Sequence, residues 1–319
     1  MQKDSKIYVA GHRGLVGSAL MRTLQAKDYI NIITRTHAEL DLIDQRAVED
    51  FLVQEKPEYV FLAAARVGGV VANSTYPAEF IYSNLAIQTN VIHASWKIGV
   101  KRLLFLGSSC IYPRECPQPI KEEYLLTGPL ETTNRPYAIA KIAGVEMCHA
   151  YNRQYGTKFL AVMPTNLYGL NDSYDLQNSH VLPALIRKMH EAKLRKDHEV
   201  VVWGTGTPRR EFLYSEDMAD ACVFLMNLAD EKYASLLSVH SFPLINIGCG
   251  EDMSIRELAE IVAKVIGFTG NLVFDSSKPD GTPRKLLSVE RMSSLGWSAN
   301  TVLESGISLA YRDFLKTPC

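Results

Sequence analysis

The chain has 319 residues, of which 47% are hydrophobic and 22% are charged. This apolar fraction is sufficient for a packed core and excludes a globally disordered chain. Its 34 Lys and Arg residues nearly balance its 35 Asp and Glu residues, which gives a formal net charge of -1. The balance excludes a protein that binds nucleic acid or an anionic membrane through bulk positive charge.

The cysteines indicate a protein of a reducing compartment. They form no CxxC pair and no clustered Cys/His spacing, which argues against a disulfide scaffold and a zinc site. The N-terminal residues do not resemble a signal peptide, and no apolar run reaches the roughly 18 residues of a membrane span. We expect a cytoplasmic protein without a metal or a membrane partner. The six cysteines are Cys110, Cys116, Cys148, Cys222, Cys249 and Cys319.

In the first half of the chain, apolar runs of about five residues alternate with amphipathic stretches of helical length. Such runs are typical of buried parallel strands in βαβ units. The predicted strands are Lys6–Ala10, Asn31–Thr34, Tyr59–Ala63, Arg102–Leu106 and Phe159–Val162. The predicted helices are Leu15–Gln25, Arg46–Lys56, Pro77 to about Lys97, and Tyr137–Tyr155. The pattern predicts a doubly wound α/β fold of the Rossmann type.

The second half of the chain is less regular. It contains a predicted helix over Val181–Lys196, a strand over Glu199–Trp203, a turn over Gly204–Pro208, a strand over Pro243–Ile247 and a helix over Ile255–Ile266. We expect a nucleotide-binding domain over residues 1–170, to which segments around residues 205–250 return. Residues 171–319 are expected to form mainly a smaller α/β lobe that binds substrate at the carboxyl edge of the sheet.

A glycine-rich segment follows the first predicted strand and opens the first predicted helix. It reads Gly11-His12-Arg13-Gly14-Leu15-Val16-Gly17. Glycines three residues apart permit a tight turn, close approach of the backbone to a pyrophosphate, and close packing of helix on strand. The helix N-terminus offers unpaired N–H groups to the phosphates. The segment therefore predicts a dinucleotide site.

The end of the second strand indicates which dinucleotide binds. An NAD site usually carries an acidic residue there, which holds the ribose hydroxyls. Here the strand ends in Arg35-Thr36-His37, and Arg13 lies within the glycine-rich loop. Basic side chains suit a 2′-phosphate, so we predict NADP(H); the alternative is that Arg35 or His37 only faces solvent.

Tyr137 and Lys141 are four residues apart and therefore share one face of a helix. A neighbouring ammonium group stabilises a phenolate, so we expect Lys141 to lower the pKa of Tyr137. A Tyr-x-x-x-Lys pair alone is common on helix surfaces. Ser108, however, follows the fourth strand at the same carboxyl edge, where its hydroxyl can bind a carbonyl oxygen together with Tyr137. The three motifs together predict a carbonyl reductase site.

In this order, the motifs resemble the extended short-chain dehydrogenase/reductase superfamily. Further segments resemble one member of it, the GDP-L-fucose synthase family, nearly from end to end. They are Ala10–Ser18, Ala63–Asn73, Phe105–Pro113, Pro136–Gly144, Pro164–Gly169, Asn178–Val181 and Lys278–Lys285. The cysteine that follows the paired serines is far more specific than the superfamily motifs.

The resemblance implies a reaction and roles for five residues. That family epimerises GDP-4-keto-6-deoxy-D-mannose at C3 and C5 and reduces the C4 ketone with NADPH. Protons at C3 and C5 are acidic because both carbons lie next to the carbonyl. By resemblance, Cys110 is the base, His180 the acid, and Ser108 with Tyr137 the donors to the enolate oxygen. Tyr137 would then protonate the C4 oxygen, and Lys141 would hold the nicotinamide ribose.

The resemblance also implies contacts to the two ligands and a homodimer. The cofactor is expected to touch the glycine-rich loop and the following further residues: Arg35, His37, Asp41, Leu42, Ala64, Leu106, Gly107, Ser108, Ser109, Lys141, Pro164, Thr165, Asn166, Leu167 and His180. The GDP-sugar is expected to touch Lys188, Trp203, Arg210, Asp280 and Lys285. A homodimer would form through the helices at Pro77–Lys97 and Tyr137–Tyr155.

Two positions depart from the family pattern. Lys188 stands where relatives carry arginine, so a positive charge remains but the bidentate fork is lost. His37 stands where arginine often meets the 2′-phosphate, which weakens the preference for NADPH over NADH. Arg13 and Arg35 would then carry that preference.

Two other readings stay open. One is another nucleotide-sugar enzyme of the superfamily, either a 4,6-dehydratase or a 4-epimerase with retained NAD. The dehydratase lacks support because Ser109-Cys110-Ile111 offers no carboxylate, and the epimerase would require an acidic end of the second strand. The other reading is a non-catalytic NADP(H)-sensing protein, which loss of Tyr137 or Lys141 would favour; both residues are present.

Overall fold

The computed structural model describes residues 1–176, 179–237, 242–278 and 280–316. Three residues of the sequence interpretation lie outside this part of the chain. They are Asn178 and Pro279 of the two motifs named above, and Cys319.

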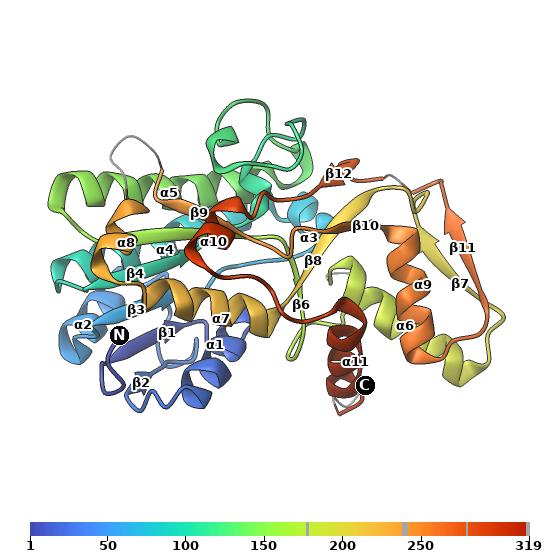
Figure 1. The fold of residues 1–319 in the computed structure, drawn as a ribbon, viewed down its shortest axis with the longest axis horizontal. Coiled ribbons are helices and arrows are strands. Elements are labelled where there is room, and N and C mark those ends of the chain that lie inside the picture. Colours follow the sequence, from blue (N-terminus) through green and yellow to red (C-terminus); the bar gives the residue numbers. More distant parts are fainter. Residues whose placement is uncertain (177–178, 238–241, 279, 317–319) are drawn as a thin grey trace.

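Six parallel strands form the central sheet in the order β2-β1-β3-β4-β5-β9 (Figure 1). They are β1 (Ile7–Ala10), β2 (Ile32–Ile33), β3 (Tyr59–Leu62), β4 (Arg102–Leu106), β5 (Phe159–Pro164) and β9 (Leu244–Ile247). Helices cover both faces, so the predicted doubly wound fold is confirmed. The strand order reverses next to β1, and ligands bind in the crevice at the carboxyl ends of strands at such a point.

Each face of the sheet has its own apolar core. The helices α2 (Gln45–Glu55), α4 (Pro77–Lys97) and α5 (Arg135–Tyr155) pack on one face, and α1 (Leu15–Ala26) and α7 (Ser215–Met226) on the other. Gly144 lets α5 approach the sheet closely, because a Cβ atom there would lie 2.4 Å from the Phe105 ring. The side chains of successive strand residues alternate between the two cores, as the pleat requires.

A third core lies in the second half of the chain. It is formed largely by α6 (Val181–Arg195), α9 (Ile255–Ile266), α11 (Leu303–Phe314) and the parallel pair β7 (Glu199–Trp203) and β11 (Asn271–Asp275). Between this core and the main sheet, β8 (Arg209–Tyr214) pairs with β6 (Asn166–Tyr168), β10 (Asp252–Ser254) and β12 (Arg284–Lys285).

The remaining elements are short and were not predicted from the sequence. They are α3 (Val70–Thr75), α8 (Asp230–Ser235), α10 (Glu290–Leu295) and single 3₁₀ turns at Ser109–Ile111, Glu122–Tyr124 and Thr132–Asn134. The longer helix α7 was also missed. Nine of its residues, including Ser215 and Asp217 in its first turn, are buried. A helix buried on most of its sides lacks the polar stripe on which a periodicity argument depends.

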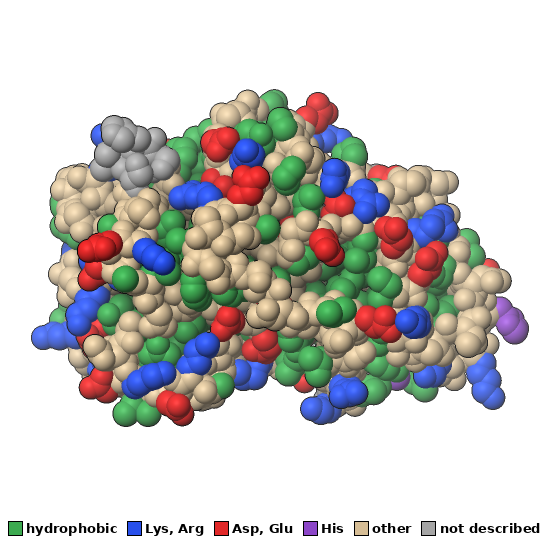
Figure 2. Space-filling model, in the orientation of Figure 1, with side chains coloured by type: hydrophobic (Ala, Val, Ile, Leu, Met, Phe, Trp, Pro, Cys, Tyr) green, Lys and Arg blue, Asp and Glu red, His purple; other side chains and the backbone are tan. Residues whose placement is uncertain are grey.

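The molecular surface agrees with the balanced composition. Figure 2 shows Lys and Arg side chains interspersed with Asp and Glu over the face in view. Within the described residues, no helix is long and apolar enough to cross a membrane.

Arg102 ties β4 to the end of α7. The residue is only 7% exposed. One guanidinium nitrogen donates to the carbonyls of Met226 (3.0 Å) and Leu228 (2.8 Å), and another donates to the Asp230 carboxylate (2.8 Å). The group also lies over the Tyr233 ring, 4.1 Å from its centroid. Both terminal nitrogens of this buried charge are therefore hydrogen-bonded, as burial of a charge requires.

Arg102→Met keeps a long aliphatic stem but removes the donors to the Met226 and Leu228 carbonyls. We expect the free energy of unfolding in urea to fall by about 2 kcal/mol, because buried acceptors lose their partners. Lys158→Met is the matched control, since Lys158 reaches the same Asp230 carboxylate from the surface (2.8 Å). An exposed ion pair contributes little, so equal losses in the two variants would contradict this account.

Candidate active site

The glycine-rich loop forms a cradle at the carboxyl end of β1. Gly11 has φ +83°, and a Cβ atom on it would lie 2.7 Å from the backbone of Ala64 at the end of β3. A Cβ atom on Gly17 would lie 2.0 Å from the Gly11 carbonyl oxygen. Gly14 is the N-cap of α1 and, among the described residues, no side chain caps this end. The loop therefore leaves helix N–H groups free for an anion.

The basic residues beside this loop are partly neutralised. Arg35 donates to the Glu55 carboxylate (2.7 Å) and lies over the Phe51 ring, 4.9 Å from its centroid. Glu55 also pairs with Lys6 (2.8 Å), so two cations share one carboxylate and a positive charge remains. The exposed His37 lies 3.7 Å from Asp41. Hence Arg35 is tied by an ion pair that the sequence pattern did not indicate.

The other predicted cofactor residues lie along the same edge of the sheet. Leu106 ends β4 and Pro164 ends β5. Gly107 donates from its backbone to Val162 (2.9 Å), while Thr165 and Asn166 donate from their side chains to the Glu211 carbonyl (3.1 and 2.9 Å). His12, Arg13, Leu15 and Val16 lie in the loop and first turn of α1; Asp41 and Leu42 follow β2; Ser109 follows Ser108; and Leu167 lies in β6.

Ser108, Tyr137 and Lys141 converge beyond the end of β4. Ser108 accepts from the Cys110 backbone N–H (3.4 Å), and its hydroxyl faces the Tyr137 phenol closely enough to lower the pKa of the phenol. Lys141, one helical turn after Tyr137, is 3% exposed and donates to the Leu106 carbonyl (2.7 Å). Its ammonium nitrogen lies 5.8 Å from the Tyr137 ring centroid. The serine and the tyrosine thus present two hydroxyls side by side.

The pKa of Tyr137 differs from the expectation. Burial raises the pKa of the phenol, the neighbouring Cys110 raises it further, and the Ser108 hydrogen bond lowers it less. Burial also lowers the pKa of Lys141 to about 8. The expectation that Lys141 lowers the pKa of Tyr137 was therefore wrong for this structure, because desolvation dominates and the ammonium is directed to the Leu106 carbonyl.

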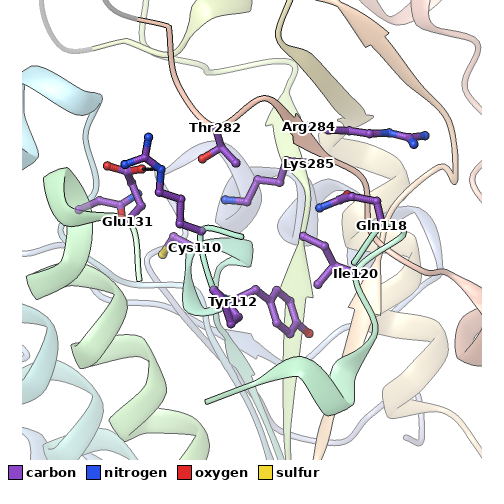
Figure 3. Close-up of a pocket in the computed structure, with 11 residues that line it drawn as sticks. Cys110, Tyr112, Gln118, Ile120, Glu131, Thr282, Arg284 and Lys285 are labelled. Atoms are coloured by element: carbon purple, nitrogen blue, oxygen red, sulfur yellow. Dashed lines mark ion pairs between the residues drawn. The ribbon is translucent and has the colours of Figure 1, made fainter. Parts of the chain in front are cut away.

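Cys110 lines a cavity of about 40 Å³ (Figure 3). Its thiol is 7% exposed, and burial raises its pKa. Lys285 of β12 lines the same cavity. His180 is the N-cap residue of α6, and desolvation together with Lys285 lowers the pKa of its imidazole. The predicted base and acid thus both lie near Lys285.

The predicted contacts to the nucleotide form a second group of side chains. Trp203 is 56% exposed at the end of β7, with the ammonium groups of Lys188 and Lys278 lying 5.2 and 5.6 Å from its ring centroid. Asp280 accepts from the Thr205 backbone (3.0 Å) and hydroxyl (2.8 Å), and it raises the pKa of Arg210 against the lowering effect of burial. Lys285 is the member of this predicted set that lies beside Cys110.

Several residues around the site were not singled out from the sequence. Lys278 belongs to the quoted Lys278–Lys285 segment but was not chosen. Arg114 and Glu131 form an ion pair (3.3 Å) at the edge of the cavity, and Glu211 is fully buried nearby. In the sequence, one feature could have indicated Arg114, namely that it closely follows Cys110. No group of three or more His, Cys, Asp or Glu residues in the described chain could hold a metal ion.

Known proteins are similar to this chain in sequence and structure over nearly its whole length. The model of the NAD dependent epimerase/dehydratase family matches residues 7–237. GDP-L-fucose synthase 1 of Arabidopsis thaliana is 57% identical, over 99% of this chain and 95% of its own length. GDP-L-fucose synthase of Escherichia coli K12 is 53% identical, over 98% and 97%. The GDP-mannoheptose C4 reductase of Campylobacter jejuni, solved with NADP bound, is 43% identical, with 99% and 100% coverage and a TM-score of 0.90. The chain belongs to the NAD dependent epimerase/dehydratase family and, within it, to the family of the GDP-L-fucose synthases.

Proposed function

We propose that this protein is an NADPH-dependent enzyme that epimerises GDP-4-keto-6-deoxy-D-mannose at C3 and C5 and reduces the C4 ketone, giving GDP-L-fucose. The observation that carries the proposal is that Cys110 lies beside Ser108 and Tyr137 at the edge of the sheet where the glycine-rich cradle opens. One site thus offers a thiol for proton removal and two hydroxyls for a carbonyl oxygen. The names of the relatives support the same substrate.

The residues at the end of β1 fit a dinucleotide phosphate. Any side chain at Gly11 or Gly17 would collide with the backbone that shapes the cradle, and the uncapped N-terminus of α1 favours an anion. Arg13, Arg35 and Lys6 provide positive charge for a 2′-phosphate, offset in part by Glu55. When bound, NADPH supplies the hydride for C4. The protein's own part is to hold the cofactor here and to place its ribose near Lys141.

Epimerisation requires a base on one face of the sugar and an acid on the other. Cys110 removes the proton from C3 or C5, and Ser108 and Tyr137 donate hydrogen bonds to the resulting enolate oxygen. His180 returns a proton from the opposite face, which inverts the carbon. Because the thiolate is the reactive form of a cysteine, the raised pKa of the buried Cys110 has to be offset by neighbouring groups.

Reduction requires a proton donor at the C4 oxygen. The raised pKa of Tyr137 keeps the phenol protonated, which suits a donor. The Ser108 hydroxyl lies beside the phenol and can bind the same carbonyl oxygen. Lys141, which is fixed by the Leu106 carbonyl, provides a nearby positive charge. The same pair of hydroxyls therefore serves both half-reactions.

The nucleotide end of the substrate is assigned to the second group of side chains. The exposed Trp203 ring offers a stacking surface, and Lys188, Lys278 and Arg210 can pair with a diphosphate. Asp280 fixes the turn at Thr205 and can accept from a base edge or a sugar hydroxyl. In this arrangement residues 1–170 hold mainly the cofactor, and residues 171–319 hold mainly the GDP-sugar.

We also propose a cytoplasmic homodimer. The five described cysteines are free thiols, as in a reducing compartment. On α4 and α5, Tyr82, Ile139 and Tyr155 are 64%, 42% and 45% exposed. Exposed apolar side chains on two adjacent long helices support a subunit interface there.

Product analysis tests the proposed function. Incubation of the protein with GDP-4-keto-6-deoxymannose and NADPH should consume NADPH, seen as loss of absorbance, and yield GDP-L-fucose by NMR. A product that is reduced but not epimerised, GDP-rhamnose, would restrict the protein to reduction. No NADPH consumption would indicate a binding protein and overturn the proposal.

Cys110→Ser should abolish epimerisation while NADPH binding survives, because the hydroxyl is a far weaker base than the thiolate. A general base typically contributes about 10²–10⁴-fold, so we expect deuterium exchange at C3 and C5 to slow by that factor, as followed by NMR. Titration of the Cys110→Ser variant with NADPH should give the same affinity as titration of the unaltered protein. Wild-type exchange rates in the variant would show that Cys110 is not the base.

Tyr137→Phe should stop reduction but leave part of the exchange at C3 and C5. The variant keeps Ser108 as one donor to the enolate oxygen but lacks the proton for the C4 oxygen. NADPH consumption and solvent exchange measured on the same sample separate the two steps. Reduction at the normal rate would exclude Tyr137 as the proton donor.

A further inference from the structure

Lys285 occupies a different place from the other cations of the predicted substrate set. Lys188 lies over Trp203, whereas Lys285 lines the cavity that contains Cys110. Figure 3 shows the Lys285 side chain extending from β12 into this cavity, on the side of Cys110. The two residues are far apart in the sequence but line the same cavity.

The backbone around Lys285 is fixed from two sides. Leu286 donates to the Gln118 side chain (2.9 Å) and its carbonyl accepts from Ile120 (2.7 Å). Leu287 donates to the buried Glu211 carboxylate (3.0 Å). Lys285 itself pairs in register with Arg210 of β8. These bonds fix the backbone from which the Lys285 side chain reaches the cavity that Cys110 also lines.

We propose that Lys285 is the electrostatic partner of Cys110, whose ammonium group holds the thiol as the thiolate that removes the C3 and C5 protons. The inference rests on the proposed function and assigns Lys285 to the reacting end of the substrate rather than to the diphosphate. It gives the buried base a counter-charge that the Ser-Ser-Cys motif alone does not contain.

The charges around the thiol support this assignment. Burial raises the pKa of Cys110, and of the groups that lower it Lys285 contributes most, ahead of the Ser108 hydrogen bond and Lys141. Tyr137 also faces the thiol. The ionisable groups that face Lys285 are Cys110, Arg210, Cys116, Glu131 and His180. Burial lowers the pKa of Lys285 and Arg210 lowers it further, while Cys110, Cys116 and Glu131 oppose this, Cys110 most strongly.

The proposed proton balance is complete within the site. The Cys110 thiolate takes a proton from C3 or C5 and becomes a thiol, and the electron pair moves to the C4 oxygen. Protonated His180 gives a proton to the opposite face of the same carbon and becomes neutral. One proton then passes from Cys110 to solvent and one from solvent to His180. Lys285 keeps its protons throughout and acts only through its charge.

The pH dependence of Cys110 alkylation tests the proposal without turnover. The full-length protein is treated with iodoacetamide over a pH series, and modification of Cys110 is followed by peptide-resolved mass spectrometry, which separates it from the other cysteines. For Lys285→Met we expect the pH midpoint to rise by about one unit, hence roughly tenfold slower alkylation below the midpoint. Lys285→Arg retains the charge and should keep the midpoint near that of the unaltered protein.

Lys121→Met is the matched control. Lys121 is adjacent to Ile120, on the segment that fixes Lys285, but its ammonium lies 3.9 Å from Glu290. This variant should leave the Cys110 midpoint unchanged. If Lys285→Met fails to fold, Lys285→Gln takes its place, because glutamine is also neutral and has a side chain of similar length.

Two results would overturn the proposal. The first is an unchanged pH midpoint of Cys110 alkylation in the neutral Lys285 variants. This includes the case in which the variants only bind GDP more weakly, as expected if Lys285 binds the diphosphate. The second is an equal shift in Lys285→Arg and Lys285→Met, which would attribute the effect to packing. Alkylation requires no substrate, so failure of the proposed GDP-sugar reaction would be seen separately in the product analysis.

Discussion

The buried carboxylate of Glu211 joins the two halves of this molecule. The residue is fully buried. Its oxygens accept from the backbone of Gly250 (2.7 Å) and Leu287 (3.0 Å), and its carbonyl accepts from Thr165 and Asn166. A side chain at Gly248 would collide with it, since a Cβ atom there would lie 2.1 Å from the carboxylate. A buried carboxylate is tolerated only when its oxygens are bonded, so these segments are held together.

The position of the candidate active site follows from this joint. The sheet supplies Ser108, Cys110 and the glycine-rich cradle at its carboxyl edge, and β8 and β12 bring Arg210 and Lys285 to the same edge. A chain with a formal net charge of -1 thereby gathers its cations where two anionic ligands would bind. The bulk charge is uninformative about such a site, because short-range placement decides where the potential is positive.

Local rules predicted a large part of the fold and the site. The short apolar runs of the central sheet, the i,i+4 pair Tyr137 and Lys141, and the glycines at Gly11 and Gly17 each carry a signal within a few positions. The bounds of α4 and β4 agree with the prediction because proline, basic residues and apolar runs mark their ends. Helix α7, which is buried on most of its sides, gave no such signal.

Long-range placement could not be predicted in the same way. Lys285 meets Cys110 only because a two-residue strand, β12, pairs with β8, and so short a strand has no periodicity. The Arg35–Glu55 pair likewise joins the end of β2 to the end of α2. The pKa of Tyr137 depends on how deeply the phenol is buried, which no residue spacing reveals.

The central claim is that one site performs both proton exchange and ketone reduction. The most direct measurement is the position of the label in the product when the unaltered protein turns over GDP-4-keto-6-deoxymannose and unlabelled NADPH in D₂O. The account predicts GDP-L-fucose with deuterium at C3 and C5 and with protium at C4. A product that is reduced at C4 but carries protium at C3 and C5 would contradict it.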